Sequence, residues 1–164
     1  MMADAIEEGD DEIFIYTGGD QEVPQHVRRA RIHRSVKIIR RRAFQNRYEL
    51  ICVEFHDEIE IIEEDAFRGC ISLRGSIKLL GVKIIKKEAF FNCIALTGVE
   101  FGDVLETIEE YAFNSCKALR TIKMPSARTI GKYAFTSCKG LSDVESKIGL
   151  APKAAINRYR FVVF

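Results

Sequence analysis

The chain has no tryptophan, only three prolines and three histidines, and almost no excess of charge of either sign among its 164 residues. Lysine and arginine together number 25 and aspartate and glutamate 24, so the net charge is +1. This balance argues against a polycation that binds nucleic acid over its whole surface. No apolar run approaches the roughly 18 residues of a membrane span. A glycine-rich phosphate loop, a nucleophile elbow and a cluster of metal ligands are also missing, so the sequence predicts no enzyme.

The first twelve residues are acidic, which is the opposite of a secretory or mitochondrial leader. Their acidic members are Asp4, Glu7, Glu8, Asp10, Asp11 and Glu12. Because no signal peptide is visible, we expect the cytoplasm or the nucleus as the compartment.

What the chain does contain is a recurring motif, Ile-x-x-x-Ala-Phe-x-x-Cys-x-x-Leu, in five copies that we call the first to the fifth coil. Their phenylalanines are 23, 23, 23 and 22 residues apart: Phe44, Phe67, Phe90, Phe113 and Phe135. A period in the low twenties is the signature of a solenoid, in which each copy stacks on the previous one.

Each coil contains two apolar stretches besides the motif. An alternating stretch such as Val53-x-Phe55 predicts a short strand with one buried face, and one extra residue before Ile77 predicts a small bulge. In the motif, Phe and Cys are three residues apart, which favours a short helix with both on its inner face. The predicted fold class is therefore an α/β repeat solenoid, with one short parallel strand and one short helical turn per coil of about 23 residues.

Three regions are expected along the chain. Residues 1–26 form the acidic segment and a capping strand, Ile13 to Tyr16, that covers the open top of the stack. Residues 27–145 form the solenoid of about five coils. Residues 146–164 match no repeat position and are expected to be an irregular C-terminal cap or a truncated repeat.

Four of the five cysteines occupy the same position of the motif, and Arg47 takes that position in the first coil. The four are Cys70, Cys93, Cys116 and Cys138. We expect them to form a column of small apolar fillers in the interior. Such a column does not converge tetrahedrally on zinc, and without a secretion signal disulfides are not expected. No metal and no cofactor are predicted.

The repeats resemble the BspA-like leucine-rich-repeat family, also described as the Treponema-type repeat. The resemblance rests on the short strand, Ile-x-x-x-Ala-Phe, and the Cys and Leu that follow, and it covers about Val27 to Glu145. It implies a right-handed solenoid with a concave face lined by strands, and a role in protein–protein interaction or, in secreted members, in adhesion. It implies no catalytic residues.

Charged residues between the apolar positions alternate in sign from coil to coil. On the concave strand face the column reads Arg31, Glu54, Lys78, Glu100, Lys123 and Glu145. Three further columns alternate in the same way: Lys37/Glu60/Lys83/Glu106/Arg128, Arg40/Glu63/Lys86/Glu109 and Arg41/Glu64/Lys87/Glu110/Lys132. Opposite charges then face each other across every pair of coils, which we interpret as a device that fixes the register of the stack.

The first coil is the most basic part of the chain. Its candidate binding patch comprises Arg28, Arg29, Arg31, Arg34, Lys37, Arg40, Arg41 and Arg42. One interpretation is a site for an anion, a phosphate or an acidic partner. The other is neutralisation within the chain, by the acidic second coil on one side and by residues 4–12 on the other.

The sequence therefore predicts a non-catalytic protein–protein interaction scaffold whose partner it does not identify, with no membrane contact. The alternative is nucleic-acid or phospho-ligand binding through Arg28 to Arg42, although the mixed charge of the strand face disfavours nucleic acid. His33 and His56 are 23 residues apart and are expected to be neighbours in the stack. They suit either a paired-histidine site or two loop residues in water.

Overall fold

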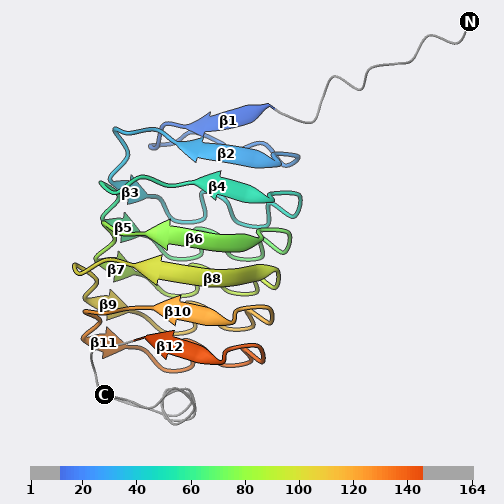
Figure 1. Cartoon of the computed structure of the whole chain (residues 1–164). Helices are drawn as coiled ribbons and strands as arrows, with labels where there is room; N and C mark the ends of the chain where they lie inside the picture. Colours follow the sequence, from blue (N-terminus) through green and yellow to red (C-terminus); the bar gives the residue numbers. More distant parts are fainter. Residues whose placement is uncertain (1–11, 146–164) are drawn as a thin grey trace, which may run out of the picture.

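The computed structural model describes residues 12–145, and side chains are described from 12 to 142. These residues form a stack of coils along one axis, with the chain running the same way in every coil (Figure 1). Each complete coil has a strand face, a second face made of two-residue strands, and a third face of tight turns. The third is called the turn face, and it comprises residues 40–47, 63–70, 86–93, 109–116 and 131–138.

The strand face consists of two parallel sheets. Its strands are β1 (Ile13–Tyr16), β2 (Arg29–Ile32), β4 (Cys52–Glu54), β6 (Gly75–Leu79), β8 (Leu96–Phe101), β10 (Thr121–Lys123) and β12 (Asp143–Glu145). The first sheet has the order β1-β2-β4 and the second β12-β10-β8-β6. The strand expected at Ile13 to Tyr16 is present as β1, and it pairs in parallel with β2. The predicted bulge is confirmed as a register shift between Gly75 and Ser76, beside the break between the sheets.

The second face is one parallel sheet of five two-residue strands. They are β3 (Ile38–Ile39), β5 (Ile61–Ile62), β7 (Ile84–Ile85), β9 (Thr107–Ile108) and β11 (Thr129–Ile130), and they stack in chain order. The second isoleucine of β3, β5 and β7 is fully buried. The first points outward, as the alternation of a strand requires.

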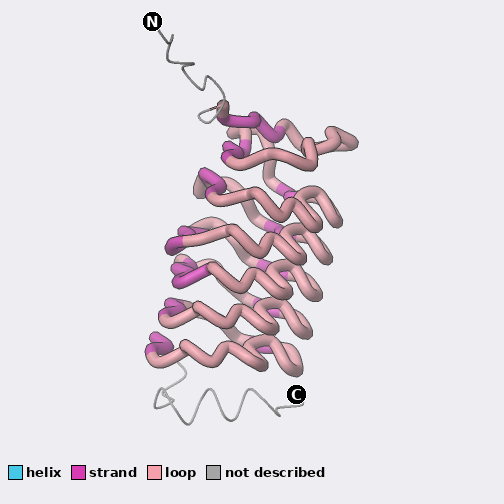
Figure 2. Tube along the Cα trace, turned by 90° about the vertical axis from the view of Figure 1, so that its right-hand side faces the viewer, coloured by secondary structure: helices cyan, strands magenta, loops and turns pink. Residues whose placement is uncertain are grey.

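The predicted helical turn is wrong: no helix occurs among residues 12–145, and the turn face is drawn as loop throughout Figure 2. A helix would use every N–H within the coil, whereas here alternate N–H groups bond to the next coil. The Ala66 N–H donates to Glu63 O in its own coil (3.2 Å), and the following Phe67 N–H donates to Ala89 O in the next coil (2.7 Å). The fold is therefore a β-solenoid of stacked parallel coils.

Two left-handed residues in each turn face explain this geometry. In the second coil they are Asp65 (φ 58°) and Gly69 (φ 74°), and in the third coil Glu88 (φ 54°) and Asn92 (φ 60°). A left-handed residue cannot continue a right-handed helix, and Gly, Asn and Asp tolerate this conformation best. Phe and Cys still face inward three residues apart, because a tight turn joins them, closed in the second coil by the hydrogen bond from the Cys70 N–H to Phe67 O (3.1 Å).

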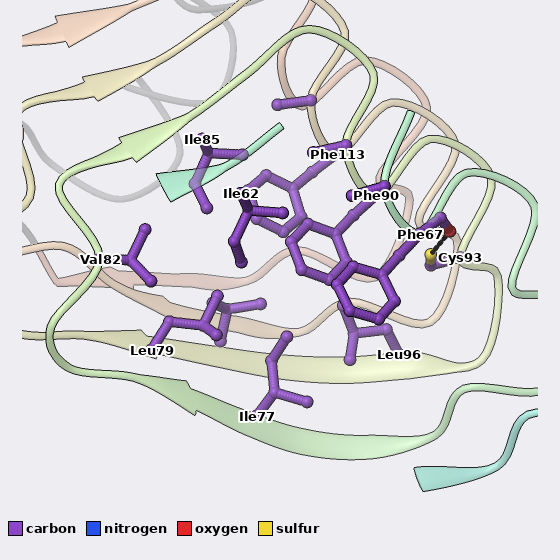
Figure 3. Packing of buried hydrophobic residues seen from close by; sticks show 14 of the residues in the cluster. Ile62, Phe67, Ile77, Leu79, Val82, Ile85, Phe90, Cys93, Leu96 and Phe113 are labelled. Atoms are coloured by element: carbon purple, nitrogen blue, oxygen red, sulfur yellow. Dashed lines mark hydrogen bonds between the residues drawn. The ribbon is translucent and has the colours of Figure 1, made fainter. Parts of the chain in front are cut away.

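The predicted phenylalanine column fills the core. Phe67 and Phe90 stack with their ring centroids 5.1 Å apart and their planes 6° from parallel, and Phe90 and Phe113 repeat this geometry at 5.1 Å and 4° (Figure 3). At the top, Tyr16 packs edge-on against Phe44 at 5.1 Å and 61°. Tyr16 therefore ends the stack by covering the last ring that has no coil above it.

The cysteine column is confirmed as buried, and its thiols also make hydrogen bonds. Each thiol donates to the carbonyl oxygen of the phenylalanine in the coil above, as Cys93 Sγ does to Phe67 O at 3.2 Å (Figure 3). Burial raises the pKa of Cys70 to about 12. These cysteines therefore connect neighbouring coils as neutral thiols.

Candidate interaction surfaces

The strand-face column of alternating charges lies as the spacing predicts. Residue pairing across the parallel strands sets Arg31 beside Glu54, and sets Glu100 beside both Lys78 and Lys123. Arg31 Nε donates a hydrogen bond to the Glu54 carboxylate and forms an ion pair with it. This hydrogen bond lowers the pKa of the Glu54 carboxyl. The backbone of Glu145 continues the series beside Lys123. The face thus offers two rows of charges of alternating sign, one on β2 and β4 and one on β6, β8, β10 and β12, with the break between the sheets separating them.

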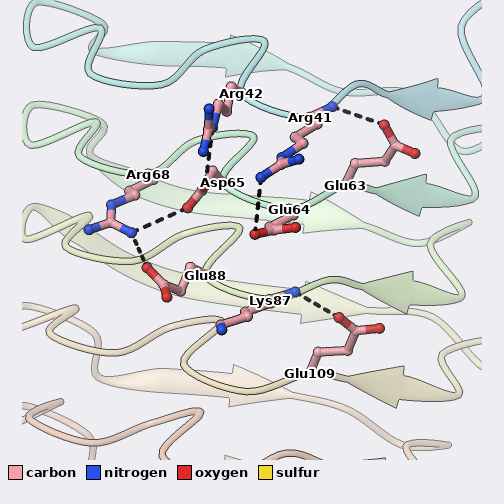
Figure 4. Close-up of polar contacts among 9 residues, drawn as sticks. All are labelled: Arg41, Arg42, Glu63, Glu64, Asp65, Arg68, Lys87, Glu88 and Glu109. Atoms are coloured by element: carbon pink, nitrogen blue, oxygen red, sulfur yellow. Dashed lines mark hydrogen bonds and ion pairs between the residues drawn. The ribbon is translucent and has the colours of Figure 1, made fainter.

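The other charge columns pair in two different ways. Direct ion pairs join Lys83 Nζ to Glu60 Oε2 (2.8 Å) and Arg41 Nη2 to Glu64 Oε1 (3.6 Å). In the remaining column, Glu63 Oε2 accepts a hydrogen bond from the Arg41 backbone N–H at 2.9 Å (Figure 4). Glu109 Oε2 does the same for the Lys87 backbone N–H, also at 2.9 Å. These carboxylates therefore bind a backbone amide of the coil above, which the sequence alternation did not predict.

A buried carboxylate network on the turn face was missed by sequence reasoning. The Asp65 side chain accepts from Arg42 Nε and from Arg68 Nη1, each at 3.4 Å (Figure 4). Arg68 also pairs with Glu88, and its guanidinium lies 4.8 Å from the ring centroid of Phe91. Because Asp65 is only 5% exposed, these partners offset the cost of burying its charge. Every charged group of this network has an oppositely charged partner within it, and the network joins the first three coils.

The candidate binding patch on the first coil is partly neutralised by the second coil. Arg31, Arg41 and Arg42 form ion pairs with Glu54, Glu64 and Asp65 respectively. Arg28 and Arg29 also have interaction partners. The side chains of Arg34 and Arg40 make no hydrogen bond or ion pair with any residue in the described part of the chain. The expected neutralisation by residues 4–11 falls outside the described residues.

A pocket of about 550 Å³ opens above the turn face of the first coil. Its lining consists of Tyr16, the cap loop 19–23, residues 40–43, Arg47 and Glu63. The pocket exists because the cap is short: β1 and β2 pair with an offset of 16 residues, from Ile13 to Arg29, whereas β2 and β4 pair with an offset of 23. The missing residues are those that would form a turn face above the first coil.

Arg47 stands at the edge of this pocket and explains why the first coil lacks the cysteine. Among residues 12–145, no phenylalanine carbonyl lies above it to accept a thiol hydrogen bond. Instead, Arg47 Nε donates to Val23 O of the cap loop (2.8 Å) and Arg47 Nη1 donates to Gln45 O (2.7 Å). The guanidinium therefore attaches the cap loop to the first coil.

The two predicted neighbours, His33 and His56, meet through the backbone. His56 Nε2 bonds to His33 O at 3.0 Å, and the Glu58 N–H donates to His56 Nδ1 at 3.2 Å. His33 Nδ1 is bonded to Ser35 Oγ at 2.8 Å. Both nitrogens of His56 are thus used locally, and residues 12–145 hold no group of three or more metal-ligating side chains.

The repeated turn face, with its stacked phenylalanines and buried cysteines, matches a known family model. Residues 37–152 match the BspA type leucine rich repeat region in six copies. The chain belongs to this family. A comparison with curated proteins finds no match. Among residues 12–145, the BspA type repeats include no helix of the length and apolarity needed to cross a membrane.

Solved structures of bacterial leucine-rich-repeat proteins have the same fold. A leucine rich repeat protein of T. pallidum is 30% identical with a TM-score of 0.62, over 65% of this chain and 50% of that one. A leucine rich cell surface protein of Faecalibacterium prausnitzii is 24% identical with a TM-score of 0.70, over 82% and 36%. A leucine-rich repeat protein of Bacteroides ovatus is 28% identical with a TM-score of 0.57, over 81% and 30%. The chain thus spans half or less of the length of each of these three proteins.

Proposed function

We propose that this chain is a non-catalytic scaffold for protein–protein interaction and that the strand face contacts the partner. The match to BspA type repeats over residues 37–152 carries this proposal, because repeat solenoids use their extended surfaces for binding. The strand face offers charges of alternating sign whose side chains stay accessible, with 51% exposure for Arg31 and 44% for Glu54. A partner with a matching row of opposite charges gains specificity from this spacing.

A second candidate function is binding of nucleic acid or a phospho-ligand through Arg28 to Arg42. The exposure of Arg34, Lys37 and Arg40 favours it, since none of the three forms an ion pair within residues 12–142. The ion pairs of Arg31, Arg41 and Arg42 weaken it, because a ligand phosphate must compete with a carboxylate at each. This leaves a smaller basic surface than the sequence suggested.

The compartment remains a prediction. The sequence favoured the cytoplasm or the nucleus, whereas one similar structure is described as a leucine rich cell surface protein. A scaffold role is compatible with either location.

Three double variants that each remove two positive charges test the proposal. Lys78→Ala with Lys123→Ala changes the strand face, Arg34→Ala with Arg40→Ala changes the first coil, and Lys117→Ala with Lys139→Ala changes exposed loops as the matched control. Each is used to capture partners from native lysate at low and high salt, with and without nuclease. The scaffold proposal expects a protein partner that the strand-face variant alone loses. A nuclease-sensitive or steeply salt-dependent partner that the first-coil variant loses would support the second candidate instead.

A further inference from the structure

Two backbone carbonyl groups of the first coil lack the hydrogen bond that the equivalent groups of every lower coil accept. In the second to fourth coils, the carbonyl oxygens of Ala66, Ala89 and Ala112 accept the phenylalanine N–H of the coil above, at 2.7, 2.7 and 2.8 Å. The equivalent group of the first coil is Ala43 O, and it receives no hydrogen bond from the described residues. The same holds for Arg41 O, whose counterpart Glu64 O accepts from the Arg42 N–H at 3.1 Å.

These two acceptors belong to residues that line the 550 Å³ pocket, and a buried hydroxyl lies beside them. Tyr16 lines the pocket with no exposed surface, and its hydroxyl donates to no described residue. Burial raises the pKa of this hydroxyl, and its oxygen has the backbone of Arg40 as a polar neighbour. A buried hydroxyl whose proton has no acceptor is unusual and indicates a site where an acceptor is missing. The pocket therefore combines two carbonyl acceptors with one hydroxyl donor, in the space where the cap lacks a turn face.

The charge around the pocket favours an acidic occupant. Four arginines line it, at positions 40, 41, 42 and 47, against the three carboxylates of Asp20, Glu22 and Glu63. Glu63 is already bound to the Arg41 backbone N–H, whereas the Arg40 side chain has no partner among the described residues. The alternation of charge from coil to coil leads to the same expectation. The basic first coil pairs with an acidic second coil below it, so an acidic segment above it would continue the alternation.

We propose that this pocket binds a short acidic segment of a protein partner, which lies over the first coil as an added turn. Backbone N–H groups of the segment donate to Arg41 O and Ala43 O, and a carboxylate of the segment bonds to the Arg40 guanidinium and the Tyr16 hydroxyl. This is strand addition transferred to the turn face of a solenoid, with the backbone giving affinity and the charges specificity. The inference rests on the proposed scaffold function and specifies one class of partner.

A second copy of the chain is a poorer occupant. The lowest described coil is basic at the positions that would meet the first coil, with Arg128 in the column of Lys37 and Lys132 in the column of Arg41. Stacking one copy on another would therefore oppose like charges in both columns. An acidic segment meets no such repulsion.

The test uses a fluorescent acetylated peptide of alternating glutamate and alanine, titrated with the full chain and followed by fluorescence anisotropy. Binding is expected to weaken about tenfold for Arg40→Glu, which removes a charge-assisted hydrogen bond. Arg34→Glu, an equal charge change outside the pocket, serves as the control and should weaken binding by less than about twofold. Tyr16→Phe should weaken binding about threefold while leaving the unfolding midpoint within error.

Backbone recognition is tested with the same peptide methylated at alternate amide nitrogens. This change keeps the charge and removes the N–H donors, so binding should be lost. If the methylated peptide binds as tightly as the parent, or if Arg34→Glu and Arg40→Glu weaken binding equally, attraction is diffuse and the proposal is wrong. Absence of any binding by the full chain also overturns it.

The other occupants give distinct results. If the peptide binds only after deletion of residues 2–11, the chain's own acidic start is the occupant and the proposal fails. If sedimentation shows the chain to associate with itself and Arg40→Glu abolishes that association, a second copy is the occupant. A failed peptide experiment beside a partner that depends on Lys78 and Lys123 would reject this site while leaving the scaffold function standing.

Discussion

The first and the third coil share one motif, yet they satisfy their polar groups with different residues. In the third coil, the Phe90 N–H bonds to the coil below and the Cys93 thiol bonds to the coil above. The described residues place no equivalent coil above the first one. There Arg47 bonds to the cap loop and Tyr16 packs on the end of the phenylalanine column. The difference shows that the repeat consensus describes a coil with two neighbours, and that departures from it indicate where a neighbour is missing.

The largest expected effect concerns the buried thiols, which the interior has and the first coil lacks. Below about pH 9.0 the thiol of Cys70 is protonated in both the folded and the unfolded chain. Above it, the unfolded chain releases a proton that the folded chain, with a pKa of about 12, retains. The free energy of unfolding therefore falls as pH rises from 9 to 12, by about 1.4 kcal/mol per pH unit and thiol, or about 4 kcal/mol in all for Cys70.

Burial also raises the pKa of Cys93 and Cys116, so the fall in stability should be steep. Urea unfolding measured by circular dichroism at successive pH values checks it. In Cys70→Ala the slope against pH should be smaller by about one proton. Identical slopes for the variant and the parent would mean that this thiol does not stay protonated in the folded chain.

The next largest effect is expected in the phenylalanine column. Phe90→Ala removes a fully buried ring that stacks on two others, so it should lower the free energy of unfolding by about 3–5 kcal/mol and uncouple the coils on either side. Phe91→Ala is the matched control, because that ring is half-buried under Arg68 and its loss should cost about 1 kcal/mol. Equal costs for the two variants in urea unfolding would show that the column is misplaced.

The sequence predicted this column well because the period alone determines it. Residues 23 apart occupy equivalent places in successive coils, so Phe67, Phe90 and Phe113 had to stack whatever path the chain takes between them. The path itself was predicted wrongly as a helix, since an inward spacing of three residues suits both a helix and a tight turn. Gly69 and Asn92, at left-handed positions, were the signals that could have distinguished them.

The end of the stack could not be predicted in the same way. Arg47 was visible as an exception to the cysteine column, but its partner Val23 O lies in a loop that repeats nothing. The pocket likewise depends on the length of the cap and on where its loop runs. The period of the repeat predicts contacts only between residues at equivalent positions of successive coils. The cap loop has no equivalent in any coil, so the period says nothing about its contacts.

A smaller effect is expected from giving the first coil the residue of the interior. Arg47→Cys loses the hydrogen bonds to Val23 O and Gln45 O, and a thiol there finds no carbonyl above it, so stability should fall by about 1–3 kcal/mol. Arg34→Cys, at an exposed loop position, is the control. Hydrogen exchange should also speed up in residues 40–47 and stay unchanged around Phe113. A variant as stable as its control would argue that Arg47 does not attach the cap.

The smallest effect is expected from the acidic residues of the second coil, which bond to the first coil above and to the third coil below. Changing Glu60, Glu63 and Glu64 together to lysine removes two ion pairs and the carboxylate bonded to the Arg41 N–H, and it opposes like charges in three columns. The melting temperature should fall by roughly 3 °C at low salt and by less at high salt, where exposed charges are screened. Asp57, Glu58 and Asp103 changed to lysine give the same net charge outside the columns and should change the melting temperature less. If both triple variants melt together at low salt, the alternation does not stabilise the register, and the contrast between coils lies in their buried residues alone.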